Sequence, residues 1–520
     1  MKAKNFIVGV LLGIFLLLNW ASALEESLTY DERAHFKTAL AEWQERNFSL
    51  DPHGPPLIRL ITVLPILIQS SGTESFLPLH RQVLPARMMI SLFGLILALV
   101  IYRYTDVSFG STAAFFALIL FVFEPNILAH SHYLTLDIGA TLAYFLAYVF
   151  ILDFLRLASF GNALKTGVFL GLALASKVTI IVPFILSLLW VIYLNRKKLN
   201  RNFWQKAFIS LVLAGLVIWA TYSFALAPII AEREDPQRLS EKILRYSEEK
   251  NLTFLKHLID FGKYQSLPLG NYLATIKNCL VFNLKPNRVE FLGKLYPGNR
   301  WYFLLVIFFL KTPIPLLFLF FWGLLVIGKN KKFLPLLIPI LLMFFFFSFS
   351  QSSGRLRYLL PIWPFLIIIA ARGADWFRQR KSGKILLVLS FLVYLGGTLF
   401  YYPHFITFAN GPFIFADSNG DWGQGLISLV EYIKKENVVD FHFSYFGTDS
   451  PENYGLVADK PFGEKFEERC PLYSIKTANQ GEKIIAISLT NYYYCGYWQQ
   501  EEFGKEKIKD VIGRSILVFK

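Results

Sequence analysis

Two adjacent carboxylates follow the first long apolar stretch of the chain. The sequence there reads Tyr30-Asp31-Glu32-Arg33-Ala34-His35, a turn or two after the apolar run ends. A carboxylate beside a bilayer is partly desolvated, and desolvation raises its pKa. Such a group suits general-base chemistry on a hydroxyl or an amine. The alternative is that Asp31 and Glu32 are ordinary solvated charges at a membrane surface.

A second polar segment lies downstream and reads Asp51-Pro52-His53-Gly54-Pro55-Pro56-Leu57-Ile58-Arg59. Two prolines at the start of a helix fix the direction in which the chain enters it. The apolar stretch that follows, 60–68, is too short to span a bilayer. It therefore predicts a helix that lies in the membrane interface beside the carboxylates. The alternative is a turn before a buried loop helix.

Long apolar runs must position these polar segments, because about 20 apolar residues span a bilayer. Of the 520 residues, 54% are hydrophobic and 17% are charged, whereas a soluble protein carries roughly 25% charged residues. This composition excludes a disordered chain and a small disulfide-rich scaffold. The candidate spans are 5–24, 83–104, 110–129, 134–153, 207–228, 302–328, 333–350 and 384–402, with a shorter run at 358–371.

The stretch 166–194 is interrupted by Ser176 and Lys177, so it fits one long helix or two short helices that turn back at Lys177. Basic residues concentrate at the N-terminus and in short loops, which the positive-inside rule places in the cytoplasm. All of these basic segments lie on the same side of the membrane only if the stretch 166–194 crosses the membrane twice. The loops are 195–206, 328–332 and 372–384.

The sequence thus predicts an all-α polytopic membrane protein with about 11 crossings, a cytoplasmic N-terminus and an external C-terminus. The net charge of +15 then reflects orientation in the membrane and is not evidence for nucleic-acid binding. The localisation that follows is a bacterial inner or plasma membrane.

The predicted membrane domain is 1–402, and the tail 403–520 is predicted to be a small external α/β domain. The tail alternates a helical stretch, Leu426–Lys435, with strand-like runs. The other external segments are 25–82, a short turn at 130–133, and 229–301. The strand-like runs are Asp440–Phe446, Lys483–Leu489 and Ser515–Phe519.

Two features of the sequence allow alternatives. Lys2, Lys4, the first apolar run and Ala21-Ser22-Ala23 also fit a cleavable signal peptide. Cys470 and Cys495 both lie in the external tail, where they form a pair in an oxidising compartment or stay as two free thiols. Cys279 has no evident partner in the sequence.

The order of the polar motifs resembles a known group of enzymes. An acidic pair after the first span, followed by His and Pro-Pro-Leu residues, is similar to the lipid-carrier-dependent glycosyltransferases of the GT-C fold. This group includes the protein O-mannosyltransferases and the bacterial aminoarabinose transferase. The resemblance continues through Arg87 in Ala86-Arg87-Met88-Met89, Pro125–Asp137, and Gly171-Leu172-Ala173-Leu174-Ala175-Ser176-Lys177.

The second half resembles a bacterial subgroup of the same superfamily. The chain departs from the family pattern at Gly54, between His53 and the prolines, and at Gly420, commonly a bulkier residue. Neither departure removes a reactive group. The similar elements are Phe291–Pro297, Trp301-Tyr302, Lys311-Thr312-Pro313-Ile314-Pro315, Arg357-Tyr358-Leu359-Leu360-Pro361 and Asp417–Gln424.

The resemblance implies transfer of a sugar from a polyprenyl phosphate to an acceptor on the outer side of the membrane. Asp31 would then be the base that deprotonates the acceptor, and Glu32 would orient the base or the acceptor. The departing lipid phosphate needs cations, and arginine binds phosphate in a bidentate manner. The predicted donor-phosphate residues are Arg87, Lys177, Lys311, Arg355 and Arg357.

Several of these residues also have simpler explanations. Arg355 and Arg357 break the positive-inside pattern, which favours a functional role, but they could contact lipid headgroups instead. Lys311 lies about ten residues into a span, where it faces a polar cavity or extends to the interface. The run Asp417–Gln424 binds sugar hydroxyls, forms a turn, or does both.

The predicted substrate-binding residues are His53, His132, Asp137, Tyr302, Asn419, Asp421, Trp422 and Gln424. Trp422 offers a flat face for a sugar ring. His130 and His132 have no matched third ligand, so no metal site and no cofactor are predicted. The expected partners are a polyprenyl-phosphate-linked sugar, membrane lipids, and a protein, lipid or glycan acceptor that the sequence does not identify.

Two other functions compete with the enzyme. A transporter or lipid-sugar flippase also contains charged residues within its spans, but it places them near mid-membrane in related halves. Here the charged residues cluster at one predicted face, and no internal repeat is visible. A membrane-anchored binding or assembly protein needs no reactive residues.

Overall fold

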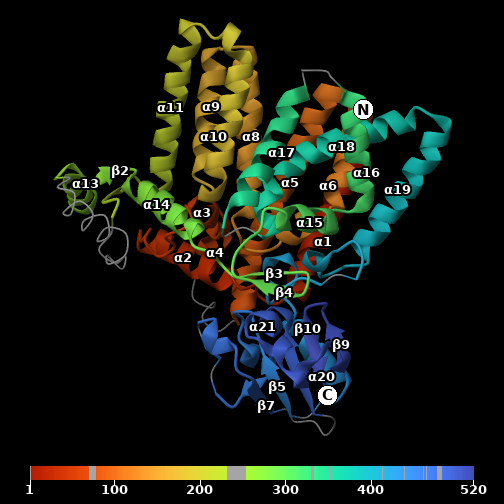
Figure 1. Ribbon diagram of the computed structural model, residues 1–520. Coiled ribbons are helices and arrows are strands. Elements are labelled where there is room, and N and C mark those ends of the chain that lie inside the picture. Colours follow the sequence, from red (N-terminus) through yellow and green to blue (C-terminus); the bar gives the residue numbers. More distant parts are fainter. Residues whose placement is uncertain are drawn as a thin grey trace.

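A bundle of apolar helices and a six-stranded sheet form the two main parts of the computed structural model (Figure 1). Parts of the predicted segments 25–82, 229–301 and 328–332 lie outside the described residues. The structure describes residues 2–69, 78–230, 253–328, 333–351, 354–412, 414–438, 440–460, 462–463, 465–476 and 483–519.

The first half of the bundle is built from long apolar segments with few breaks. Gly110 separates two of these helices with a φ of 87°, a conformation that residues with a Cβ rarely adopt, so α6 turns back and packs against α5. The helices are α1 (Lys2–Glu25), α5 (Leu79–Phe109), α6 (Ser111–Val122), α7 (Pro125–His130), α8 (Asp137–Arg156), α9 (Phe160–Leu174), α10 (Ile181–Asn195) and α11 (Arg201–Thr221).

The stretch 166–194 contains two helices, α9 and α10, which lie beside α8 and α11 (Figure 1). The Nζ of Lys177, just after α9, bonds Asp137, the first residue of α8. At the other end, Lys206 of α11 donates to the carbonyl of Ala158, which precedes α9. The chain therefore reverses at Lys177, as the distribution of basic loops predicts.

The second half contains a sharply bent pair of helices and a buried central helix. Helices α15 (Phe303–Lys311) and α16 (Ile314–Ile327) meet at 108°. Helix α16 packs closely on α18, because a Cβ on Gly323 would lie 2.0 Å from the carbonyl oxygen of Ile369. The remaining elements are α17 (Leu334–Phe349), η5 (Leu356–Ile362), α18 (Trp363–Arg378) and α19 (Lys381–Leu399).

Among the described residues, seven helices are long and apolar enough to cross a membrane, and the bent pair α15–α16 makes up to eight. Three shorter apolar helices, α6, α9 and α17, lie in the same bundle. The predicted class, a mostly helical polytopic membrane protein, is confirmed. The number of membrane crossings, about 11, stays a prediction.

Short elements lie near the end of the bundle that faces the sheet, some between the two parts and some to one side (Figure 1). The apolar stretch 60–68 falls in two short helices rather than one. These elements are α2 (Glu32–Gln44), α3 (Leu57–Thr62), α4 (Leu64–Gln69), α13 (Thr253–Tyr264), α14 (Gly270–Leu284) and two small antiparallel pairs, β1 (Leu226–Ala227) with β2 (Leu267–Pro268) and β3 (Val289–Phe291) with β4 (Lys294–Tyr296).

The C-terminal part is an α/β unit, as its alternating pattern predicts. Its sheet has the order β6-β7-β5-β8-β10-β9, in which only the β5–β8 pair is parallel. Its core packs α20 (Leu426–Lys435) against strand side chains such as Phe443 and Val518. The strands are β5 (Phe441–Ser444), β6 (Val457–Ala458), β7 (Tyr473–Lys476), β8 (Ile484–Ser488), β9 (Ile508–Ile512) and β10 (Ile516–Phe519), and α21 (Leu489–Tyr494) follows β8.

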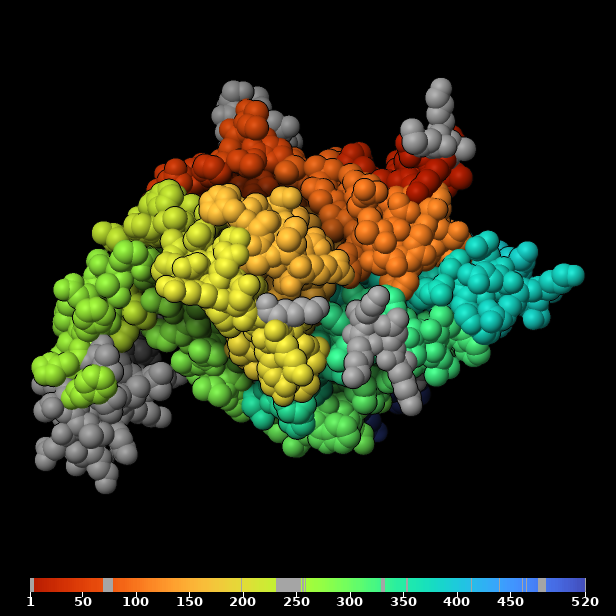
Figure 2. Space-filling view, turned by 90° about the horizontal axis from the view of Figure 1, so that it is seen from above, coloured from red at the N-terminus to blue at the C-terminus, as the bar shows by residue number. Residues whose placement is uncertain are grey.

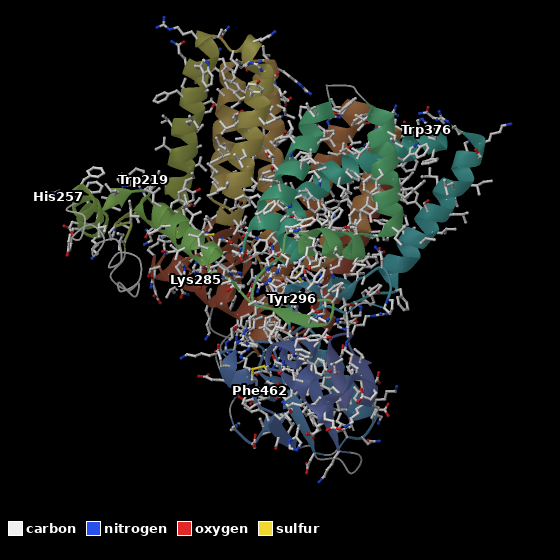
Figure 3. The ribbon with its side chains drawn as sticks, in the orientation of Figure 1. Trp219, His257, Lys285, Tyr296, Trp376 and Phe462 are labelled. Atoms are coloured by element: carbon white, nitrogen blue, oxygen red, sulfur yellow. A yellow bond between two sulfur atoms is a disulfide. The ribbon has the colours of Figure 1, made fainter. Side chains whose placement is uncertain are left out.

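A disulfide joins Cys470 and Cys495, so the pairing alternative is the one observed. The bond lies on the side of the sheet unit that faces the bundle (Figure 3). Cys279 is a free, buried cysteine.

The N-terminus and the α10–α11 connection lie at the end of the bundle opposite the sheet unit (Figure 1). Figure 2 views the molecule from that end, where α19 projects from the side of the bundle. The basic loops with described residues, 195–206 and 372–384, are at this end.

Candidate active site

A cavity of about 980 Å³ lies where the bundle, the short helices and the sheet unit meet. Tyr30 and Asp31, just before α2, and His35 of α2 line it, and the sheet unit contributes Phe446, Phe466 and Cys470. A cavity of this size holds a drug-sized or sugar-sized ligand. Seven of the predicted site residues line it: Asp31, His53, Asp137, Lys177, Arg355, Arg357 and Trp422.

Asp31 immediately precedes α2, and its side chain makes no capping bond to that helix. Instead its Oδ2 accepts a hydrogen bond of 2.8 Å from Nη1 of Arg357. The chain before Asp31 is fixed to the sheet unit, because Tyr30 donates its N–H to the carbonyl of Trp422 over 2.8 Å. Asp31 thus faces the cavity from a well-held position.

Two further ion pairs line the same cavity. Lys177 at the α9–α10 reversal bonds Asp137 at the start of α8. Arg355 binds Asp417 through Nη2 at 2.6 Å and through Nε at 2.8 Å. The charges of Arg355 and Arg357 outweigh burial and hold the pKa of Asp417 below its usual value. Three pairs of a cation and a carboxylate therefore line the cavity.

Aromatic rings surround these charges. The guanidinium of Arg357 lies 4.6 Å from the centre of the Trp422 ring, and the ammonium of Lys177 lies 5.2 Å from that of Tyr358. Tyr30 stacks on Phe446 at 4.7 Å. Aromatic faces hold cations and also offer surfaces to sugar rings.

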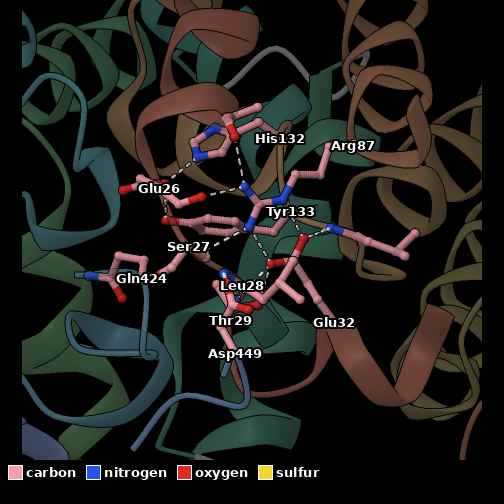
Figure 4. A network of polar contacts seen from close by, with 12 residues as sticks. Glu26, Ser27, Leu28, Thr29, Glu32, Arg87, His132, Tyr133, Gln424 and Asp449 are labelled. Atoms are coloured by element: carbon pink, nitrogen blue, oxygen red, sulfur yellow. Dashed lines mark hydrogen bonds and ion pairs between the residues drawn. The ribbon is translucent and has the colours of Figure 1, made fainter. Parts of the chain in front are cut away.

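Glu32 and Arg87 are not among the residues that line the cavity; they bond each other in a buried polar network (Figure 4). Arg87 is 1% exposed, and it donates five hydrogen bonds, to both carboxylate oxygens of Glu32 and to three backbone carbonyls. Glu32 also accepts from the N–H groups of Thr29 and Leu134. The pair therefore holds the end of α1, the segment after it and the start of α2 together.

The donor-phosphate role predicted for Arg87 stays a prediction. Its N–H groups are all engaged within the protein, so the proposals below do not use it. The orienting role expected for Glu32 stays a prediction as well.

His132 is also absent from the cavity lining, and it belongs to a cluster of polar side chains around Glu26 (Figure 4). The Glu26 carboxylate bonds Nε2 of His132 at 2.7 Å, the hydroxyl of Tyr133 at 2.7 Å and Nδ1 of His404 at 2.8 Å. Burial disfavours this charge, but the hydrogen bonds from the two histidines hold the pKa of Glu26 at about 2. His404 also bonds Ser428 of α20, so the cluster links α1 to the sheet unit.

The remaining predicted residues of the 417–424 run stabilise that run. Asn419 accepts from the N–H of Leu356 and donates to the carbonyl of Gly354. Asp421 accepts from the N–H of Thr490, and burial raises its pKa to about 6. Gln424 donates to the carbonyl of Gly420. These side chains fix the loop that presents Trp422 and Asp417.

Lys311 and Tyr302 are also outside the cavity lining. The Nζ of Lys311, at the end of α15, bonds the carbonyls of Ile406, Phe408 and Asn419. It thereby joins the bent helix pair to the start of the C-terminal part. Tyr302 is 37% exposed and packs on aromatic neighbours. The substrate contacts predicted for these two residues stay predictions.

Sequence reasoning did not select several cavity residues, among them His35, Asp51, Arg288, Tyr358 and Asp417. His35 is one helical turn after Asp31, so the i, i+4 spacing was a usable signal. Burial lowers its pKa. Asp51 and Glu42 bind the buried Arg59, which fixes the Pro-Pro segment against α2.

In the part of the chain that the structure describes, no group of three or more His, Cys, Asp or Glu side chains is placed to hold a metal ion.

Comparisons with known proteins point to one fold. Residues 75–222 match the family model described as dolichyl-phosphate-mannose-protein mannosyltransferase. The apo structure of ArnT from Cupriavidus metallidurans is similar over 100% of this chain and 98% of its own, with 13% identity and a TM-score of 0.53. The same protein bound to undecaprenyl phosphate gives the same identity and TM-score over 99% of this chain and 98% of its own.

An oligosaccharyltransferase from Archaeoglobus fulgidus, in complex with Zn and sulfate, matches 82% of this chain and 55% of its own at 14% identity, with a TM-score of 0.45. No match was found among curated protein sequences. The chain therefore has the GT-C fold of ArnT along its full length, and its residues 75–222 match the mannosyltransferase family.

Proposed function

We propose that this protein is an integral-membrane glycosyltransferase that moves a sugar from a polyprenyl-phosphate-linked donor to an acceptor at the outer face of the membrane. The observation that carries this proposal is the Asp31–Arg357 pair, in a cavity that also contains Lys177 and Arg355. A carboxylate base beside a set of cations is what transfer from a lipid phosphate requires.

Each group has a part in the reaction. Asp31 removes the proton of the acceptor hydroxyl or amine as the acceptor attacks the anomeric carbon. The bond from that carbon to the phosphate oxygen breaks, and its electron pair leaves with the lipid phosphate. Arg357, Lys177 and Arg355 stabilise the charge that grows on the phosphate. Asp137, His53 and Trp422 contact the sugar.

The family match and the ArnT structure bound to undecaprenyl phosphate support a lipid-phosphate donor. Residues of the sheet unit line the cavity together with residues of the bundle, so the cavity lies at the end of the bundle that carries the sheet unit. The described basic loops lie at the other end (Figure 1). Positive loops face the cytoplasm, so this arrangement supports an external active site.

Asp31→Asn tests the reaction directly. Purified protein in nanodiscs is given a panel of radiolabelled polyprenyl-phosphate sugars, and release or transfer of the sugar is measured. We expect Asp31→Asn to lower kcat by about 100-fold or more, because it removes the general base.

Asp510→Asn makes the same chemical change at an exposed position on β9 and should keep full activity. Full activity of Asp31→Asn would refute the assigned base. If no donor of the panel releases its sugar, the protein is not this enzyme and the transporter is favoured. A transporter should instead move the lipid across the bilayer of a proteoliposome.

A further inference from the structure

Helix α13 carries a row of exposed side chains, which we call the aromatic stripe. The stripe consists of Phe254, His257, Phe261 and Tyr264. Their spacing of three, four and three residues places them within about a quarter of the circumference of a helix with 3.6 residues per turn. Phe254 is 70% exposed, Phe261 49% and Tyr264 77%. Large apolar side chains in one exposed patch mark a surface that contacts a partner or a membrane.

The other side of α13 packs against the protein. Ile259 is buried, and Gly262 is buried beside the side chain of Ile230. The carbonyl of Gly262 also accepts a hydrogen bond of 2.9 Å from the N–H of Ile230. Helix α13 is therefore held on one side and presents the aromatic stripe on the other.

Helix α13 lies near the level at which the candidate membrane span α11 ends (Figure 1). Phe208 and Leu211 of α11 are exposed apolar side chains, as expected of a surface that faces lipid. Near the end of α11, the ring of Trp219 packs on that of Phe224 at 5.3 Å. Tryptophan is enriched where a membrane meets water. Trp219 and His257 are on the same side of the molecule (Figure 3), so the stripe continues the lipid-facing surface of α11 at its end.

We propose that α13 is an interfacial helix, and that its aromatic stripe inserts into the membrane leaflet on the side of the sheet unit. Aromatic rings suit the headgroup region, where an apolar body meets a polar surface. Asp260 and Lys263, which are half-buried, lie outside the stripe and keep their charges out of the lipid. The proposal rests on the membrane class of the fold and needs neither the donor nor the base of the proposed function.

The leaflet thereby holds one wall of the cavity in place. Helix α13 is followed by β2, which pairs with β1, and then by α14. The start of α14 touches β1, because a Cβ on Gly270 would lie 1.8 Å from the carbonyl oxygen of Ala227. The α14 residues that line the cavity are Cys279, Phe282 and Asn283.

Spin labels on the full-length protein in nanodiscs test the insertion. Phe254→Cys and Phe261→Cys each receive a nitroxide, and its accessibility to oxygen and to a water-soluble nickel complex is measured. Of the three cysteines, two form the disulfide and Cys279 is buried, so unlabelled positions give little background. We expect oxygen to reach both labels better than nickel does, at a depth of about 5–10 Å.

Two further labels calibrate the measurement. Phe208→Cys, on the exposed side of α11, should give the signal of a lipid-facing site. Val457→Cys, an exposed apolar position on β6 of the sheet unit, should be reached by nickel. If the two α13 labels behave as the Val457→Cys label does, the proposal is wrong. Strong dipolar coupling between the α13 labels of two copies in vesicles would identify a second copy as the occupant and would also overturn it.

Hydrogen exchange tests the hold on the cavity wall. Phe254→Ser with Phe261→Ser removes the two phenylalanine rings of the stripe, so the amides of α14 should exchange about tenfold faster in nanodiscs than in wild type. Equal exchange in both proteins would show that the leaflet does not hold α14. Neither measurement uses a sugar donor, so a failure of the proposed function and a failure of this proposal are distinguished.

Discussion

The buried pair of Arg87 and Glu32 offers a quantitative test of how the candidate base is held in place. Arg87→Met removes five hydrogen bonds, of 2.6 to 2.9 Å, and leaves the carboxylate of Glu32 without its cation at 0% exposure. Removal of one partner from a buried ion pair costs about 3–5 kcal/mol, because the other charge stays buried and unpaired. We therefore expect a loss of about 3–5 kcal/mol in the free energy of unfolding.

The second variant in this test is Glu32→Gln, and the third combines both changes. The double variant, Arg87→Met with Glu32→Gln, removes the carboxylate charge that Arg87→Met alone leaves buried and unpaired. The double variant should therefore be more stable than the sum of the two single losses predicts, by about 2 kcal/mol or more, within the range measured for contacting residues. Denaturant titration in mixed micelles, followed by far-ultraviolet circular dichroism, measures the four proteins of this cycle.

Arg103→Met is the matched control, since the Arg103 side chain is 76% exposed and lies 3.8 Å from Asp106. An exposed ion pair contributes about 0–1 kcal/mol, so this variant should unfold almost as wild type does. A loss below about 1 kcal/mol for Arg87→Met would refute the reasoning, as would strict additivity of the two single losses in the double variant.

Two further predictions concern the sheet unit and its link to the bundle. The pKa of Glu26 is about 2 in the folded protein and 4.5 in the free group. The ionised carboxylate therefore stabilises the folded protein by up to ~3 kcal/mol above about pH 4.5, and this stabilisation is lost as the pH falls toward 2. Unfolding midpoints between pH 5 and 3 should therefore fall less in Glu26→Gln than in wild type, and parallel curves would contradict this. The disulfide Cys470–Cys495 spans 25 residues, and loss of such a loop constraint costs about 3–4 kcal/mol in the chain-entropy model. Cys495→Ser should lower the thermal midpoint and make it insensitive to a reductant; a wild-type midpoint that a reductant leaves unchanged would contradict this.

The sequence predicted features that depend on local pattern and on topology. The reversal at Lys177 followed from the distribution of basic loops, and helix α20 from its amphipathic spacing. Asp31 could be selected as a site residue because a carboxylate close to the end of an apolar span is unusual, whatever the fold of the rest of the chain. These signals need no knowledge of distant contacts.

The partners of the cations could not be predicted in the same way. Arg87 bonds Glu32 across 55 positions, Lys311 bonds Asn419 across 108, and Arg357 bonds Asp31 across 326. A position near the end of a span indicates a polar environment, but it does not distinguish a cation that faces a cavity from one that bonds backbone carbonyls.

Arg355 and Arg357 lie at the start of the span that η5 and α18 form together, and this has a consequence for how new specificities could arise. The span Leu356–Arg378 is the most enclosed of the candidate spans, with 89% of an 18-residue stretch within it buried. The side of the cavity that carries these arginines is therefore fixed by the packing of the whole bundle. The opposite side, with Phe446, Phe466 and Glu467, belongs to the sheet unit and its loops. We expect substitutions in these loops to exchange one acceptor for another while the chemistry of the donor phosphate stays the same.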